Sequence, residues 1–138
     1  MQIHSLLYVS RSLLPTQHDD HLVDMIVQLG QERNAYLGVT GALIFTHLHF
    51  AQYLEGSRSN VDVLMESIRH DRRHTDIEIL NKNVTSQRMF SRWGLAYSGP
   101  SHFADRQIGE AAGHAQGTAR SRITERLLWM MREFCSLI

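Results

Sequence analysis

The apolar residues of this chain follow two different spacings over roughly residues 1–97. Short apolar runs predict four β-strands, at residues 2–10, 41–46, 50–54 and 77–84. Apolar residues three or four positions apart predict an amphipathic helix over about residues 19–33 and a second helix after Gly56. The order of elements is therefore strand, helix, strand, strand, helix, strand.

Polar and charged residues mark where these elements end. His47-Leu48-His49 separates two of the strands, which predicts a β-hairpin. Ser59 or Asn60 is expected to cap the second helix, and the charged cluster from His70 to His74 ends it. The apolar stripe of that helix consists of Val61, Leu64, Met65 and Ile68.

This order is typical of an α+β, ferredoxin-like βαββαβ fold with both helices on one face of the sheet. The usual strand order of that fold, 4-1-3-2, makes the first and third strands neighbours, so Tyr8 and Gln52 are expected on adjacent strands. The helix-free face is apolar as well. It carries Leu7, Val9, Ala51 and Tyr53, and an apolar face of that size must be covered.

The remainder of the chain supplies further elements. A fifth strand is expected around Trp93, Leu95 and Tyr97, which share one parity, as side chains of one sheet face do. Pro100 and the glycines at 109, 113 and 117 predict short or irregular structure. Residues 118–138 form a predicted amphipathic helix that would cover the second sheet face or contact a partner, with Ile123, Leu127, Met130, Met131, Phe134 and Ile138 on its apolar side.

Composition excludes several classes of protein. The 138 residues suit one compact unit, and 14 basic against 14 acidic side chains give no positive field for nucleic acid. Cys135 is the only cysteine, so neither an intramolecular disulfide nor a cysteine-based zinc site can form. No apolar run has the length of a membrane span or a signal peptide, which predicts a soluble, cytoplasmic protein.

An amide inside an apolar strand is the first sign of a site. Gln52 lies in FAQYLEG, and a buried amide is unfavourable unless its donors and acceptor have partners. Tyr8 by itself suits an ordinary strand tyrosine, and Asn34 by itself suits a helix C-cap or turn. Together the three place a phenol and two amides near the centre of the sheet, where a planar heterocycle could satisfy them.

Two other groups of residues have simpler explanations than a functional site. His70, Asp71 and His74 have a spacing that could place two imidazoles on one helical face for a metal, but a solvated helix end explains them better. Cys135 sits among apolar residues of the last predicted helix, where packing explains it better than nucleophilic catalysis. No metal is expected.

The motifs of this chain resemble the BLUF domains, which sense blue light using flavin. The resemblance rests on LLYVS with Tyr8, RNAYLGVTGALIF with Asn34 and Gly41, FAQYLEG with Gln52, IRHDRRH, and MFSRWGLAY. The combination of N-x-x-x-G-[IV]-T-G-x-L with F-x-Q-x-L-E-G is specific, and the similarity covers roughly residues 1–97. It implies a flavin-binding domain at 1–97 followed by a helical extension or cap at 98–138.

The resemblance also implies roles for individual residues. Tyr8 would donate an electron and a proton to the excited flavin, and Gln52 would flip or tautomerise, changing its hydrogen bonds and shifting absorption to the red. Asn34 would hold the polar edge of the ring. Further cofactor contacts are implied for Ile26 and Ile68 on the two faces of the ring, and for Arg33, Asp71, Arg73 and His74 near its edge or the ribityl and phosphate side.

The resemblance further implies how a signal would leave the domain. Trp93 and Leu95 would relay the change through the fifth strand, although many family members have methionine where this chain has Leu95. The implied cofactor is FAD in preference to FMN or riboflavin. The implied partners are a second copy of the chain and a downstream protein, with no direct contact to nucleic acid or membrane and no catalytic output domain of its own.

The alternative function is a small ferredoxin-like enzyme acting on a phosphate or acyl group. Arg72, Arg73 and His74 would form its anionic subsite. The colour of the purified protein separates the two hypotheses, because only the photoreceptor needs bound flavin.

Overall fold

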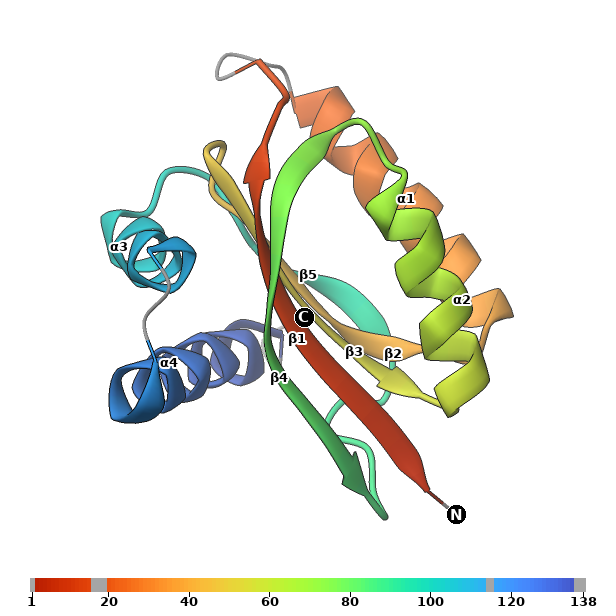
Figure 1. Ribbon diagram of the computed structural model, residues 1–138. Helices are drawn as coiled ribbons and strands as arrows, with labels where there is room; N and C mark the ends of the chain where they lie inside the picture. Colours follow the sequence, from red (N-terminus) through yellow and green to blue (C-terminus); the bar gives the residue numbers. More distant parts are fainter. Residues whose placement is uncertain (1, 16–19, 114–115, 136–138) are drawn as a thin grey trace.

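A computed structural model describes residues 2–15, 20–113 and 116–135 of the chain. Five strands form one sheet in the order β4-β1-β3-β2-β5, which confirms the predicted arrangement of the first four (Figure 1). The strands are β1 (Ile3–Ser12), β2 (Thr40–Phe45), β3 (His49–Gly56), β4 (His74–Thr85) and β5 (Trp93–Ser98). The helices are α1 (Asp20–Tyr36), α2 (Arg58–Arg69), α3 (His102–Ala112) and α4 (Gly117–Cys135).

The register of the central strands places the predicted pair together. β1 and β3 are antiparallel, and Tyr8 lies directly opposite Gln52. β2 and β3 are joined as an antiparallel hairpin, and His47 in the turn has a positive φ of 76°. The first and third strands are therefore neighbours, as the element order predicts.

The helices cover the two faces of the sheet as separate layers. α1 and α2 lie on one side, and α3 and α4 lie on the other (Figure 1). The first layer encloses a core that includes Tyr8, Leu43, Leu54, Leu64 and Ile68. This core contains the candidate site.

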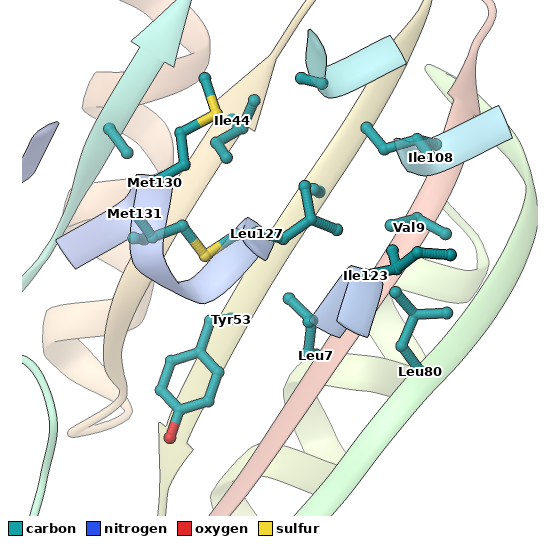
Figure 2. Close-up of a cluster of buried hydrophobic side chains, with 14 of the residues drawn as sticks. Leu7, Val9, Ile44, Tyr53, Leu80, Ile108, Ile123, Leu127, Met130 and Met131 are labelled. Atoms are coloured by element: carbon teal, nitrogen blue, oxygen red, sulfur yellow. The ribbon is translucent and has the colours of Figure 1, made fainter. Parts of the chain in front are cut away.

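The second core confirms that the C-terminal helix covers the remaining apolar face. Figure 2 shows Ile123, Leu127, Met130 and Met131 of α4 above the strands, and these side chains are buried there with Leu7, Val9, Ile44 and Tyr53. Phe134 is 37% exposed at the margin, so its expected burial is only partial. Ile138 lies outside the described residues.

Residues 102–112, where short or irregular structure is predicted, form one short continuous helix. These residues form α3, which Ser101 caps by accepting a hydrogen bond from the Ala104 backbone N–H. Ala104, Ile108 and Ala111 are buried against the sheet. One glycine inside a helix, here Gly109, costs only about 1 kcal/mol relative to alanine, which this packing offsets.

The fifth strand departs from simple alternation. It runs parallel to β2, not beside β3, and a register irregularity follows Leu43. Trp93 and Leu95 pack on the α1/α2 side, whereas Tyr97 packs on the α3/α4 side. The expectation that these three share a face is therefore wrong for Tyr97, because the irregularity reverses the face.

Several helix boundaries in the structure differ from the predicted ones by a few residues. The cap of α2 is Ser57, not Ser59 or Asn60, and it accepts a hydrogen bond from the Asn60 N–H. α1 extends to Tyr36, so Asn34 lies inside a helix and is not its C-cap. None of the described helices is long and apolar enough to cross a membrane.

Candidate functional site

A pocket opens between the sheet and the two helices α1 and α2. It contains every residue predicted to bind the cofactor except Asn34, together with Trp93. Its lining also includes residues that sequence reasoning missed: Leu29, Gly30, Leu43 and Phe50. Gly30 follows Ile26 by four residues on α1, so helical spacing could have indicated that it shares this face.

Three buried side chains from β1, β3 and β5 form a continuous hydrogen-bonded chain. The Gln52 amide Nε2 donates to the Tyr8 hydroxyl over 2.5 Å, and the Trp93 indole Nε1 donates to Gln52 Oε1 over 2.9 Å. Tyr8, Gln52 and Trp93 are only 3%, 5% and 6% exposed. Both ends of the buried amide therefore have partners, and Trp93 contacts Gln52 directly although its strand is not adjacent to β3.

Burial also sets the protonation of Tyr8. Loss of contact with water raises the pKa of the phenol well above its ordinary value, and the hydrogen bond from Gln52 opposes this only in part. Tyr8 is consequently neutral at physiological pH. Because its oxygen is the acceptor in the bond from Gln52, the phenol proton is not used by that amide.

Asn34 supplies the strongest sign that this part of the protein binds a ligand. Its side chain is fully buried on α1, yet neither Nδ2 nor Oδ1 has a hydrogen-bond partner among the described residues. The neighbouring Arg33 Nε is also buried without such a partner. Burying a polar group without a hydrogen-bond partner is unfavourable by about 1–3 kcal/mol. The Asn34 amide and the Arg33 Nε are therefore candidates to bond polar atoms of a ligand.

Apolar side chains from the two helices α1 and α2 line the pocket. Ile26 of α1 and Ile68 of α2 both line the pocket, and both are at least nine-tenths buried. Phe50 adds a ring that stacks on Phe45 and meets His74 edge-on. The pocket therefore has apolar walls with hydrogen-bonding groups concentrated along the sheet and α1, which suits a flat ring with one polar edge.

The far side of the pocket is held by an ion pair. Asp71 binds the guanidinium of Arg73 through both carboxylate oxygens, with contacts of 2.5–3.0 Å. These hydrogen bonds lower the pKa of Asp71 and raise that of Arg73. Burial lowers the pKa of Arg33 on the facing helix.

His74 joins three elements at the pocket wall. Its Nε2 lies 2.8 Å from the Ile68 carbonyl oxygen and its Nδ1 lies 2.7 Å from the Ser10 hydroxyl. A carbonyl only accepts, so Nε2 carries a proton, and the ring ties α2 to β1 and β4. His74 therefore shapes the pocket with both nitrogens already bonded.

The histidine spacing does not assemble a metal site. α2 ends at Arg69 and His74 begins β4, so His70 and His74 do not share a helical face, contrary to the geometry that a metal would need. Among the described residues, no group of three or more His, Cys, Asp or Glu side chains could hold a metal ion.

Comparison with known proteins identifies the family. Residues 3–96 match the family described as BLUF, sensors of blue-light using FAD. The chain belongs to the BLUF family. This match covers the five strands up to Ala96, α1 and α2, and leaves α3 and α4 outside it.

Curated BLUF relatives are much longer proteins. The chain is 30% identical over 95 residues to the photoactivated adenylate cyclase subunit alpha of Euglena gracilis, covering 68% of this chain and 9% of that protein. It is 33% identical over 73 residues to the blue light- and temperature-regulated antirepressor BluF of Escherichia coli K12, covering 53% of this chain and 18% of that protein. The chain thus spans less than a fifth of these relatives.

Solved BLUF structures share the architecture. The dark-state structure of the BLUF protein BlrB has a TM-score of 0.71 at 25% identity and covers 96% of both chains. Klebsiella pneumoniae BlrP1 with FMN and cyclic diGMP has a TM-score of 0.59 at 30% identity, over 70% of this chain and 25% of that one. BLUF domains bind flavin, and the apolar walls of this pocket and its buried Tyr8–Gln52–Trp93 chain fit such a ring.

Proposed function

We propose that this chain is a blue-light photoreceptor that binds a flavin between α1 and α2 and uses Tyr8 and Gln52 as its photochemical switch. The observation that supports it most is the buried Tyr8–Gln52–Trp93 chain in the pocket wall, together with a buried amide on α1, Asn34, that has no partner among the described residues. A core without a ligand would gain nothing from that amide.

Different residues would contact the faces and the polar edge of the flavin ring. Ile26 and Ile68 would contact its two apolar faces, while Asn34 and Gln52 would bond its polar edge. Arg33, Asp71 and Arg73 would set the charge at the edge and toward the ribityl chain. His74, with both nitrogens already bonded, would contribute the shape of the wall.

Tyr8 is suited to transfer an electron and a proton together. The bound flavin would supply blue-light absorption and an excited state that accepts both. Burial disfavours a charged phenolate and equally a charged phenol radical cation, so loss of an electron from Tyr8 favours loss of its proton as well. Gln52 touches the Tyr8 oxygen and is thus the first group to respond to that transfer.

Rotation of the Gln52 amide would break its contact with Trp93. The indole Nε1–H only donates, and at present it meets Gln52 Oε1. Exchanging the amide nitrogen and oxygen would place two donors against each other. The switched state would therefore release Trp93, and with it the first residue of β5.

The finer assignments extend this proposal. FAD is the proposed flavin because the family description names it, and mass spectrometry of the released cofactor distinguishes it from FMN. We further propose residues 1–97 as the flavin-binding domain and 98–138 as its cap, with Trp93 and Leu95 passing the signal on. The proposed setting is the cytoplasm, with a second copy and a downstream protein as partners. The cyclase and antirepressor names of the relatives support a downstream output.

The enzyme hypothesis loses support in this geometry. Two of the three residues of its anionic subsite are already engaged, since Arg73 pairs with Asp71 and His74 bonds Ser10 and Ile68. We therefore retain only the photoreceptor.

A light-minus-dark absorption spectrum tests the proposal. Tyr8→Phe and Gln52→Leu should still bind flavin but lose the reversible red shift, because the electron and proton donor or the switching amide is gone. Tyr36→Phe is the control, because Tyr36 is 91% exposed on α1, and it should keep the shift. A full reversible shift in either site variant would refute the mechanism, and a protein that takes up no flavin would refute the function.

A further inference from the structure

Glu55 is a buried carboxylate that the photochemistry does not use. It lies three residues after Gln52 on β3, points to the opposite side of the sheet, and is only 1% exposed. Its Oε1 accepts the backbone N–H of Met89 over 2.8 Å and its Oε2 accepts that of Phe90 over 2.6 Å. The Thr40 hydroxyl donates a third hydrogen bond, to Oε2 at 3.2 Å, and the Tyr53 hydroxyl donates a fourth, to Oε1 at 3.5 Å.

These bonds hold a segment with no regular structure of its own. Residues 86–92 connect the end of β4 to the start of β5. Hydrogen bonds from backbone N–H groups to a carboxylate are charge-assisted and stronger than neutral ones, and burial keeps water from competing. We call the Glu55 carboxylate with the Met89 and Phe90 N–H groups the Glu55 clamp.

Arg88 reinforces the clamp from the surface. Its guanidinium donates to the carbonyl oxygens of Gly38 and Glu55, at 2.9 and 3.0 Å, and to the Thr40 hydroxyl at 2.9 Å. The connection is therefore bound both to β3 and to the residues that lead into β2. Because Arg88 is exposed, water competes for its bonds, and its contribution should be smaller than that of Glu55.

The clamp ends three residues before Trp93. Beyond it, the Gly41 N–H bonds the Arg92 carbonyl oxygen and Trp93 takes its place opposite Gly41 in the ladder. Strand β3 therefore contacts the start of β5 at two points. Gln52 binds the Trp93 side chain on the pocket face of the sheet. Glu55 binds the backbone of Met89 and Phe90, just before β5, on the other face.

We propose that Glu55 is a positioning residue of the light switch: its clamp fixes the start of β5 so that the Trp93 indole reaches Gln52. This inference rests on the proposed photoreceptor function. The clamp would keep the backbone upstream of Trp93 in place, so that a change at Gln52 moves the indole and β5 instead of loosening the whole connection.

Nitrogen-15 NMR of the indole groups in the full flavin-bound chain tests this in the dark. Trp129 is 54% exposed on α4, so Trp129→Phe leaves Trp93 as the single indole signal with little disturbance. In that background, Glu55→Ala should speed exchange of the Trp93 Nε1–H with solvent by about tenfold, since the bond to Gln52 opens more often. Glu55→Gln keeps one acceptor oxygen and should fall between.

A merely structural role for Glu55 predicts something different. Thr46→Val is the control, because it removes the hydrogen bond of the buried Thr46 hydroxyl to Asp105, just after the other end of β2, without touching the clamp. Glu55→Ala and Thr46→Val would then lower the unfolding midpoint alike and leave the Trp93 exchange rate unchanged, which would overturn the proposal. Arg88→Ala gives a milder variant should Glu55→Ala fail to fold, and it too should raise the exchange rate.

A second measurement, of recovery in the dark after illumination, tests whether the clamp affects the light-induced state. After illumination, the dark recovery rate constant of Glu55→Ala should differ from that of Thr46→Val by about fivefold, because Trp93 holds one end of the Gln52 amide. Equal rate constants in the two variants would contradict the proposed link. If the unmodified chain showed no light-induced shift, the photoreceptor function would fail, whereas the dark exchange result would still decide the role of the clamp.

Discussion

Gly30 lies on α1 where the indole ring of Trp93 packs against the helix backbone. A Cβ atom built at Gly30 would lie 2.7 Å from Trp93 Cη2 and 2.9 Å from Cζ3, closer than real carbon atoms approach. The flat ring is held between this helix and β5, so it has little room to yield. The missing side chain at Gly30 is thus what allows Trp93 to lie inward, beside Gln52.

Gly30→Ala should displace the indole and weaken its bond to Gln52. Overpacking costs about 1–3 kcal/mol, against a gain of about 1 kcal/mol in helix propensity, so the free energy of unfolding should fall by about 1 kcal/mol. Gly109→Ala is the control, since a Cβ on that helical glycine meets nothing within 4 Å, and it should stabilise the protein by about 0.5–1 kcal/mol. Urea unfolding measures both, and equal stabilisation would show that Trp93 is not confined.

Single residues of the site differ in how far the sequence predicts them. Tyr8 and Gln52 are predictable as a pair because strand alternation and strand order are both visible in the pattern. Glu55 is not, although it lies in the same seven-residue stretch. Its partners are backbone N–H groups 34 and 35 residues away, and backbone groups leave no trace in residue type.

At the scale of elements, the connection from α2 to β4 is held by Asp71 and Arg73. Hydrogen bonds from Arg73 lower the pKa of Asp71, more than burial raises it. A carboxyl whose pKa is lower in the folded chain stabilises the fold above its unfolded pKa of about 3.9. That stabilisation disappears as the pH falls through the lower folded pKa, when Asp71 takes up a proton.

Asp71→Asn should therefore destabilise the protein at neutral pH and have a much smaller effect in strong acid. The pair is partly exposed, so we expect a loss of about 1 kcal/mol at pH of about 7, and a difference from the unmodified chain that narrows as the pH approaches about 2. Denaturant unfolding at both pH values measures the gap. A gap that stays constant with pH would mean that the charge of Asp71 contributes nothing. Asp62→Asn, in an exposed pair with Arg58 at 4.0 Å, is the control and should change little at either pH.

A helix or strand could be predicted where one spacing of apolar residues continues along the chain. It could not be predicted where helix-favouring and helix-breaking residues occur together. The stripe of α4 continues over several turns, so its cover of the second sheet face could be predicted. α3 carries the signals of a cap at Ser101 and of buried Ala104 and Ile108, but Gly109 and Gly113 pointed the other way. The irregularity that turns Tyr97 to the other face depends on pairing with β2, which is a tertiary property.

At the scale of the whole molecule, the sheet separates two cores with different tasks. The α1/α2 core contains the pocket, whereas the α3/α4 core contains apolar side chains and the buried Glu55 clamp at its edge. β5 contacts both, with Trp93 in one core and Ala96 in the other. A displacement of Trp93 would therefore reach the packing of α4 through this short edge strand.

Deleting residues 118–138 tests whether the second sheet face needs the cover that α4 provides. The truncated chain would expose Leu7, Ile44 and Tyr53, which α4 now buries, and an apolar sheet face of this size drives association. We expect aggregation or a changed mass in light scattering. Trp129→Ala removes an exposed side chain from the same helix and should leave the mass as it is. A truncated chain that stays soluble with the mass per particle scaled only by the deletion would show that the face needs no cover.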